Sequence, residues 1–443
     1  MKILFFYILT LLCVSAESPA QDPSVDPTPG RIPDSTFIIE RIIVAGNNMT
    51  KDFVILREMT LKPGGYLTQQ LLEYDQNRIY SLGLFNQVRI RPELSSPGKV
   101  LLTVEVSERW YIFPIPIIGI KDRSWSKAYY GLGLLHNNFR GRNEKLYLML
   151  IFGYDKSFSL SYRNPFLTEN GSTFLESRLG YYKIRNKSRI SGSDSPDFDE
   201  SHISASLTAG KRIGIEHTAW LSAGYEIVSI PEYSPGRTIS AGGTDRFGFL
   251  GIGYSYDTRD LYEYPSYGTY FRCGVTKSGF TTVGLNTVRY SADIRRYSQV
   301  GSGLVVSGRG FGELSAAGTT PSYSRVYFGY NERIRGHFHE IIEGENLLGF
   351  SSELHLTLLE PVYKKIDFMP AEFSILKLGI VAAVFGDAGS AWFRGTPLML
   401  KEFKKGYGFG LHFLLPYSMV LRTEYAFNEI RRGEFIIDIG SMF

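Results

Sequence analysis

The chain has very little cysteine and, after its first residues, no long apolar run. Its 443 residues include two cysteines, Cys13 and Cys273. If Cys13 is removed with a leader segment, no intramolecular disulfide can form, and no cysteine cluster of the zinc-binding kind is present. Beyond residue 20, no stretch approaches the 18 consecutive apolar residues of a membrane-spanning helix. The sequence therefore predicts neither a disulfide framework nor a transmembrane helix.

The net charge of the chain is small, and histidines are few. The chain carries 48 Lys and Arg against 44 Asp and Glu, a formal net charge of +4. This near balance argues against a basic nucleic-acid surface, so we expect no nucleic-acid partner. The seven histidines are scattered, and His337 with His339 has no third ligand nearby in the sequence. We therefore expect no metal and no other cofactor.

Catalytic motifs are missing as well. No Gly-x-Ser-x-Gly nucleophile turn occurs, which removes the partner that a patatin-type Asp-Gly dyad at residues 386–389 would need. A phospholipase barrel would need a serine and histidine pair on its wall. His217-Thr218 and Ser201-His202 offer only adjacency in the sequence. We expect no enzyme activity.

The first 34 residues have the composition of an export signal and a linker. A single early charge, an apolar run to Cys13 and the small residues Val14-Ser15-Ala16 predict a cleaved secretory signal over residues 1–20. Cys13 could instead mark a lipoprotein, but Leu12 precedes it where a small residue is required. Residues 21–34 contain four prolines in a short polar run, which predicts a linker.

Aromatic residues and glycine are abundant. The chain has 29 Tyr, 30 Phe and 46 Gly, yet its mean hydropathy is slightly negative. From Trp110 onward, short stretches of alternating polar and apolar residues are separated by turn-forming residues. They include residues 145–151, 158–162, 203–207, 220–225, 247–256, 270–276 and 305–311. This pattern predicts an antiparallel β-barrel whose strands alternate lipid-facing and lumen-facing residues; a soluble all-β protein is the alternative.

The predicted barrel covers residues 109–443. At about 20 residues for each strand and its connection, this length permits ~16 strands. The polar residues 186–200 are expected to form an extracellular loop. The end of the chain has the pattern expected of a closing strand. One face carries Phe435, Ile437, Ile439 and Phe443, and the other carries Ile436, Asp438 and Gly440.

Residues 35–108 predict a small α+β domain. A strand over residues 37–44 ends at a Gly-Asn turn, and Thr50 is a candidate N-cap for a first helix. Residues 63–65, Pro-Gly-Gly, end that helix. A second helix is expected to begin near Thr68 and to end at Gly83. Two strands follow, over residues 87–91 and 99–107.

This small domain resembles a POTRA domain, the periplasmic module of the BamA/TamA outer-membrane assembly factors. The resemblance is carried by Ile43-Val44-Ala45-Gly46-Asn47, by the helix pattern from Thr50 to Glu58, and by Tyr80-Ser81-Leu82-Gly83-Leu84-Phe85-Asn86-Gln87-Val88. The Leu-Gly-x-Phe turn into a strand is characteristic of these modules. One such domain is found here.

The barrel region resembles the bacterial surface antigen barrels of the same superfamily. Residues 138–143, Asn-Phe-Arg-Gly-Arg-Asn, are similar to the family's first-strand motif, and residues 256–260, Tyr-Asp-Thr-Arg-Asp, with Pro265 and Gly268 are similar to a hairpin motif. Arg333-Ile334-Arg335-Gly336-His337 matches the tip of a loop that folds back into the barrel lumen. Phe385-Gly386-Asp387-Ala388-Gly389 matches the strand that receives this loop.

The two matched segments predict a contact inside the barrel. An arginine on a lumenal loop needs a carboxylate partner, because an unpaired buried charge is costly. We predict that Arg335 pairs with Asp387, with Glu353 as a second acceptor. Gly336 would permit the tight loop tip, and Gly386 and Gly389 a close approach of the backbone. His337 stands where the family has an aromatic ring, which weakens the expected packing of the tip.

The resemblance implies a function in handling unfolded polypeptides. It implies a bacterial outer-membrane barrel with its POTRA domain in the periplasm, in contact with outer-membrane lipid. The implied clients are unfolded β-barrel or secreted polypeptides, and periplasmic or lipoprotein accessory factors are possible partners. Two devices would serve this work, a POTRA strand edge that captures a client strand and a weak seam between the first and last barrel strands. The alternatives are a two-partner-secretion transporter and a passive pore.

Overall fold

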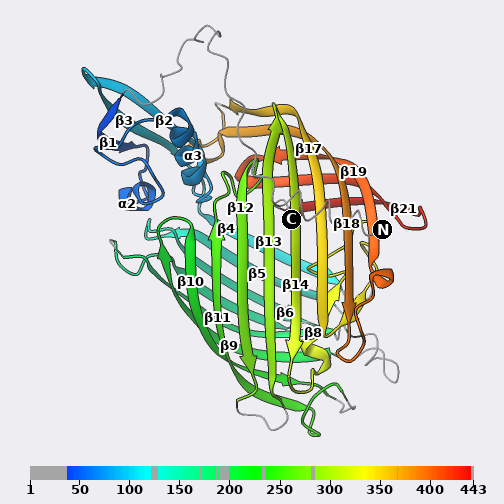
Figure 1. Cartoon of the computed structure of the whole chain (residues 1–443). Coiled ribbons are helices and arrows are strands. Elements are labelled where there is room, and N and C mark those ends of the chain that lie inside the picture. The colour runs from blue at the N-terminus through cyan, green and yellow to red at the C-terminus, as the bar shows by residue number, and fades with distance from the viewer. Residues whose placement is uncertain are drawn as a thin grey trace.

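The computed structural model describes residues 37–120, 128–154, 156–169, 171–185, 188, 199–231, 236–280, 285–366 and 368–440. The predicted signal peptide and linker, Phe443 and most of the predicted loop 186–200 lie outside these residues. The described chain forms a small α+β domain followed by a large antiparallel sheet (Figure 1). None of the helices in the described residues is long and apolar enough to cross a membrane.

The small domain contains a three-stranded sheet and two helices. Its elements are β1 (Ile38–Ala45), α2 (Asp52–Leu56), α3 (Gln69–Tyr80), β2 (Phe85–Ser96) and β3 (Lys99–Glu108). The strand order is β1-β3-β2, with β1 parallel and β2 antiparallel to β3. The core between the sheet and the helices includes the fully buried Ile39, Val54, Ile79, Leu102 and Val104. The predicted order of strand, helix, helix, strand, strand is confirmed.

The helix ends differ in part from their prediction. Thr68 is the N-cap of α3, and its hydroxyl accepts a hydrogen bond from the backbone of Leu71 at 3.2 Å. The prediction that this helix begins near Thr68 is confirmed. The C-cap of α3 is Ser81, so the prediction that this helix ends at Gly83 is two residues too long. Lys51, rather than Thr50, is the N-cap of α2. Thr50 fails as a cap because its hydroxyl is bound to Glu108 instead.

Over the described residues, the large sheet contains 16 antiparallel strands, in agreement with the predicted number of ~16. They are β4 (Ile112–Ile120), β5 (Ala128–Phe139), β6 (Glu144–Gly153), β7 (Ser157–Asn164), β8 (Thr173–Arg185), β9 (Asp199–Ile213), β10 (His217–Ser229), β11 (Thr244–Asp257), β12 (Gly268–Ser278), β13 (Thr287–Gly301), β14 (Leu304–Ala316), β17 (Asn346–Lys365), β18 (Ile375–Trp392), β19 (Lys404–Leu415), β20 (Met419–Asn428) and β21 (Gly433–Gly440). The short strands β15 (Val326–Phe328) and β16 (Ile342–Gly344) form a separate ladder between β14 and β17.

The strands alternate between an apolar outer face and a more polar inner face. In β21, Phe435, Ile437 and Ile439 are 62%, 62% and 66% exposed, whereas Ile436 between them is 2% exposed. Exposed apolar side chains recur in the same alternation along the neighbouring strands, for example Tyr407 and Phe409 in β19. A continuous exposed apolar band of this kind marks a surface that meets lipid rather than water.

The sheet curls so that its first strands pass behind β11 to β14 (Figure 1). Strands β4 and β21 are the two ends of the strand order, and no ladder joins them among the residues that the structure describes. A transmembrane sheet must close to satisfy its edges. The closing junction between β4 and β21 is therefore the seam of the barrel.

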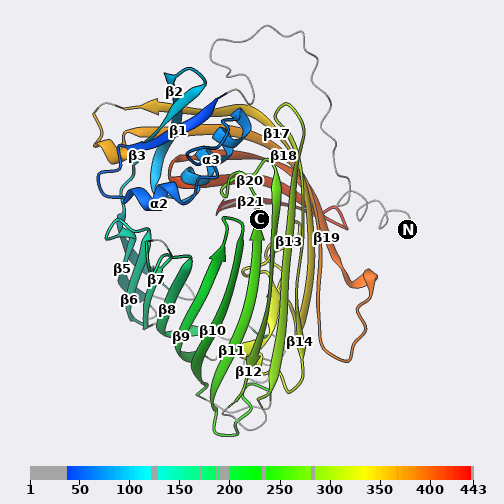
Figure 2. The same cartoon turned by 60° about the vertical axis from the view of Figure 1, so that its left-hand side comes forward.

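The small domain lies across one end of the barrel strands (Figure 2). It contacts the turns that connect β5 to β6, β7 to β8 and β9 to β10. Its core also includes Phe166 from the turn between β7 and β8. The domain and the barrel mouth therefore share one packed interface.

Candidate functional site

The loop between β15 and β16 folds back onto the inner face of β17 to β20. Its residue Arg335 donates from Nε and Nη2 to the two oxygens of Asp387, each at 2.7 Å. The backbone N–H of Arg335 donates to the same carboxylate at 3.1 Å. Nη1 donates to Glu353 and, at 3.0 Å, to Glu424. The structure thus places Arg335 against both predicted acceptors and against a third that the sequence analysis did not name.

This cluster is buried and rich in charge. Arg335 is 8% exposed, and Glu353 and Glu424 are 3% and 2% exposed. The predicted residue Phe385 packs its ring 3.7 Å from the guanidinium. A buried arginine is tolerated only when its donors are matched, and the bidentate pair with Asp387 provides that match. We call these residues, Arg335, Asp387, Glu353 and Glu424, the Arg335 lock.

Two histidines complete the lock. One arginine faces three carboxylates, so further donors are required on the carboxylate side. His355 Nε2 lies 2.6 Å from Glu353, and His412 Nε2 lies 3.1 Å from Glu424. Both rings are buried, each about 1% exposed. No sequence motif pointed to these histidines. His355 lies two residues after Glu353 in β17, and this spacing places the two side chains on the same face of the strand.

Glycines let the loop reach the strands. Gly336 has φ +95°, and a Cβ there would lie 2.6 Å from the carbonyl oxygen of Phe427. A Cβ on Gly406 of β19 would lie 1.5 Å from the carbonyl oxygen of Arg335. Gly406 was not among the residues predicted from the sequence. The sequence pattern that could have revealed it is the alternation of Gly406, Gly408 and Gly410, which leaves the lumenal face of one strand without side chains.

Gly386 of β18 and His337 of the loop correct two expectations. A Cβ on Gly389 would meet Phe328 at 2.6 Å, as a close approach requires, but the nearest atom to a Cβ on Gly386 is 4.0 Å away. The expectation for Gly386 is therefore wrong, because its face of β18 has open space. His337 does not loosen the loop tip either. It is 7% exposed, and its nitrogens lie 2.5 Å from Glu340 and 2.6 Å from Glu429.

The seam carries a second feature that the sequence analysis missed. Strand β4 pairs with β5 without interruption from Ile112 to Ile120 and contains Pro114 and Pro116. Proline has no N–H to donate, so both residues must turn their backbone away from β5 and toward the seam. The seam edge of β4 therefore offers carbonyl acceptors at these positions but lacks two donors. Strand β21 lies on the other side of the seam, and its last described residue is Gly440, which was predicted to belong to the closing strand.

The motif at residues 138–143 joins the small domain to the barrel. It lies at the turn between β5 and β6, the second and third strands, so its prediction as a first-strand element is wrong. Asn138, fully buried, donates to the Thr50 hydroxyl at 2.9 Å. A Cβ on Gly141 would lie 2.0 Å from the carbonyl oxygen of Met49. The motif's residues are required because the two backbones nearly touch here.

A buried ion cluster makes the second contact between the domain and the barrel. Glu58 accepts hydrogen bonds from Arg212 of β9, at 2.7 Å to Nη2, and from Arg78 of α3 at 3.1 Å. Burial alone raises the pKa of Glu58, but the hydrogen bonds and charges of the two arginines outweigh it and hold this pKa below its usual value. Glu58 is therefore ionised at neutral pH and ties the domain to the barrel wall.

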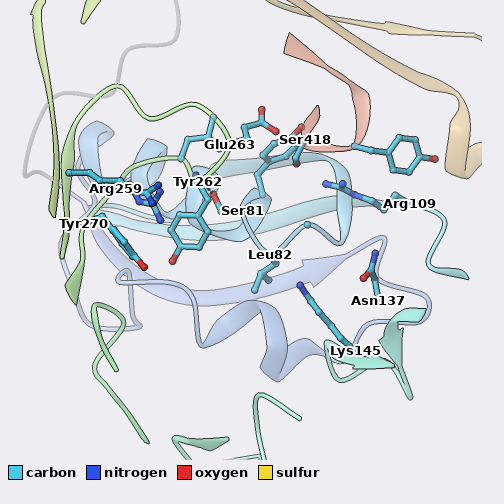
Figure 3. A pocket seen from close by; sticks show the side chains of 15 residues that line it. Ser81, Leu82, Arg109, Asn137, Lys145, Arg259, Tyr262, Glu263, Tyr270 and Ser418 are labelled. Carbon is cyan, nitrogen blue, oxygen red and sulfur yellow. Dashed lines mark hydrogen bonds between the residues drawn. The ribbon is translucent and has the colours of Figure 1, made fainter. Parts of the chain in front are cut away.

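A cavity of about 490 Å³ lies between the small domain and the barrel lumen (Figure 3). Arg109, Asn137 and Lys145 line one side of it, and Arg259 and Tyr262 line the other. Within the described residues, no carboxylate lies within ion-pair distance of Arg109 or Lys145. No cluster of three or more His, Cys, Asp or Glu suited to a metal ion occurs in the same part of the chain.

Together these features define a class of protein. A 16-stranded antiparallel sheet with an outer apolar band, a loop locked inside it and an α+β domain across one mouth describe a transmembrane β-barrel with one POTRA domain.

Comparisons with known proteins agree with this class. The POTRA family model, described as a surface antigen variable number repeat, matches residues 37–109, and the Omp85 superfamily domain matches residues 138–443. The curated outer membrane protein assembly factor BamA of Neorickettsia risticii is 26% identical over 237 residues, which cover 49% of this chain and 31% of that protein. The chain spans about a third of the length of the curated relatives that it matches.

Two solved structures share the fold. BamA from Haemophilus ducreyi lacking POTRA domains 1–3 has a TM-score of 0.54 and 17% identity, covering 92% of this chain and 85% of that one. CdiB from Escherichia coli has a TM-score of 0.55 and 12% identity, covering 92% and 77%. The chain belongs to the Omp85 superfamily. It is an outer-membrane barrel with its POTRA domain on the periplasmic side.

Proposed function

We propose that this protein assembles other outer-membrane proteins, inserting unfolded β-barrel polypeptides into the membrane without catalytic chemistry. The observation that carries the proposal is the seam. Pro114 and Pro116 remove two donors from the edge of β4 that faces β21. A seam that lacks donors on one side opens at lower cost than a complete ladder, and its carbonyls then accept hydrogen bonds from a client strand.

The POTRA domain supplies the capture surface in this proposal. Backbone groups of residues 64–67 cover the start of the outer edge of β1 through hydrogen bonds to Phe37 and Ile39. Within the described residues, nothing pairs with the backbone of the outer edge over residues 42–45. A client strand added there would extend the sheet by β-augmentation. The edge is short, which suits transient capture.

The Arg335 lock has a structural role in this proposal. It ties the lumenal loop to three strands, β17, β18 and β20, the last of which pairs with the closing strand β21. Gly336 and Phe338 also donate backbone hydrogen bonds to Glu434 of β21, each at 2.8 Å. The lock therefore holds the C-terminal side of the seam in shape while the β4 side is free to separate.

The test is reconstitution into liposomes of outer-membrane lipid, with insertion of an unfolded barrel client followed by its heat-modifiable gel shift. Intact protein should accelerate client folding. Arg335→Ala should lose the acceleration, while Tyr323→Phe, which changes a lumenal hydroxyl elsewhere, should keep it. Equal client folding with and without the protein would refute the proposal. Accessory periplasmic or lipoprotein factors can be added to the same assay.

The second candidate is secretion of one dedicated polypeptide. It is favoured by the fold shared with CdiB and by the cation-lined cavity at the periplasmic mouth. In the same liposomes, a transporter would carry its polypeptide into a protease-protected lumen without inserting a barrel client. A passive pore would give ion conductance alone.

A further inference from the structure

The connection between β11 and β12 is a conspicuous element to which the proposed function assigns no task. We call residues 258–267 the strap. Its own side chains hold its shape, since Asp260 accepts hydrogen bonds from Ser266 N at 2.9 Å and from Tyr267 N at 3.3 Å. Asp260 and Glu263 are both buried, at 5% and 6% exposed. Such a loop is built to occupy one position rather than to swing in solvent.

One side of the strap is anchored on the POTRA domain. Leu261 packs against the core of the small domain. The backbone N–H of Tyr262 donates to the Ser81 hydroxyl, the C-cap of α3, at 3.2 Å, and Figure 3 shows the two residues side by side above the cavity. The Arg78 guanidinium lies 5.4 Å from the Tyr262 ring. Arg78 is also a donor to Glu58, so the anchor belongs to the interface that docks the domain.

The other side of the strap reaches into the barrel wall. Glu263 forms a buried ion pair with Lys377 of β18. The ring of Tyr264 packs against Val381, Leu414 and Val420. It also lies 5.3 Å from the His355 ring and 5.9 Å from the His412 ring, centroid to centroid. Tyr264 thus contacts both histidines that donate to the Arg335 lock.

The hydroxyl of Tyr264 sets the orientation of His412. The two groups are 2.9 Å apart, from Oη to Nδ1. On the far side of the ring, Nε2 faces Glu424, a carboxylate that only accepts, so Nε2 carries the hydrogen. In the neutral ring Nδ1 is then an acceptor, and the Tyr264 O–H is its donor. The ring is held between these partners with Nε2–H aimed at Glu424, which also receives Arg335 Nη1.

A continuous path therefore runs from the POTRA domain to the lock. It passes from Ser81 to the strap, from Tyr264 to His412, and from Glu424 to Arg335. We propose that Tyr264 is a positioning residue for the Arg335 lock and that the strap transmits the docking of the POTRA domain to the lumenal loop. This inference rests on the proposed function for its biological purpose. The strap would transmit client capture at the POTRA domain to the lumenal loop, which lies next to the seam.

The experiment is amide hydrogen exchange of the loop residues 329–341 in the full-length protein in liposomes. Tyr264→Phe removes the hydroxyl and keeps the ring. Leu261→Ala removes the apolar contact of the strap with the POTRA domain and alters no residue of the lock. Tyr323→Phe is the matched control, because its hydroxyl donates to Asp245 at 2.7 Å and has no contact with the lock. Exchange should rise about five-fold in Tyr264→Phe, the size expected for one lost hydrogen bond. It should also rise in Leu261→Ala and stay unchanged in the control.

Each other outcome overturns a defined part. Unchanged exchange in Tyr264→Phe would refute the positioning role. A rise in Tyr264→Phe without a rise in Leu261→Ala would refute the link to the POTRA domain. If Leu261→Ala also raises exchange in β3, the domain itself has loosened. Ser81→Ala, which removes the acceptor of the Tyr262 N–H, then takes its place, and unchanged loop exchange in that variant would refute the link to the POTRA domain. The measurement needs no client, so a failed insertion assay and a failed strap are separate results.

Discussion

The carbonyl oxygen of Arg335 lies where a side chain on residue 406 would begin, 1.5 Å from an ideal Cβ on Gly406. The loop and β19 approach so closely that the lock can form only over a glycine. This contact joins residues 71 positions apart in the sequence, and it explains why position 406 of β19 is occupied by glycine.

Gly406→Ala should therefore displace the lumenal loop. The new methyl group overlaps a backbone atom, which cannot move aside as a flexible side chain would. We expect the free energy of unfolding of the barrel to fall by about 1–3 kcal/mol. The measurement is the midpoint temperature of the heat-modifiable gel shift, which should decrease. Gly386→Ala is the matched control, because the nearest atom to its Cβ is 4.0 Å away. Equal losses in both variants would contradict the steric account.

Removal of the Arg335 side chain should lower the free energy of unfolding by more than the loss of one hydrogen bond does. Arg335→Ala leaves Asp387, Glu353 and Glu424 buried without their shared cation, a change of about 3–5 kcal/mol for broken buried pairs. Arg335→Lys restores the charge but not the bidentate geometry, so it should recover only part of the loss. Unfolding in denaturant measures both. With Asp387→Asn in a double-mutant cycle, additive effects would show that the two residues act separately.

Restoring donors at the seam should close it. Replacing Pro114 and Pro116 by valine adds two N–H groups on the edge of β4 that faces β21. We expect a more stable barrel and slower client insertion, because the seam must open against a fuller ladder. Ile115→Val is the control, since its N–H already faces β5. Faster insertion in the double valine variant would refute the role of the prolines.

Docking of the POTRA domain should weaken in acid. Glu58 has a lowered pKa in the docked state, so its contribution is complete above its usual pKa and is lost as pH falls through the lowered value. Spin labels on Leu94→Cys and Ile213→Cys, with Cys273→Ser, would report the distance between domain and barrel. The distance distribution should broaden only in acid.

Glu58→Gln supplies the control for this titration. It should broaden the same distribution already at neutral pH, because the arginines Arg78 and Arg212 lose their counter-charge. A wild-type distance that broadens on raising the pH instead would show that another group governs docking.

The sequence alone determined the features that depend on the spacing of residues close together in the chain. Alternation of apolar residues predicted the strands, and its length predicted their number, because a strand repeats its face every second residue wherever it pairs. The start of α3 near Thr68 was predictable because the capping bond that fixes it is local, reaching only three residues along the chain. The pairing of Arg335 with Asp387 was predicted from motifs, and the structure places the two in contact.

The tertiary structure decided what depends on register and approach between distant segments. Thr50 has the side chain of a cap, but Glu108 lies close enough to take its hydroxyl. Gly406, His412 and Glu424 join the lock only because β19 and β20 stand at that register beside β18. The prolines of β4 matter only because that strand ends the sheet. Local composition sets the strands, whereas the free energy of burying charge selects which distant residues must meet.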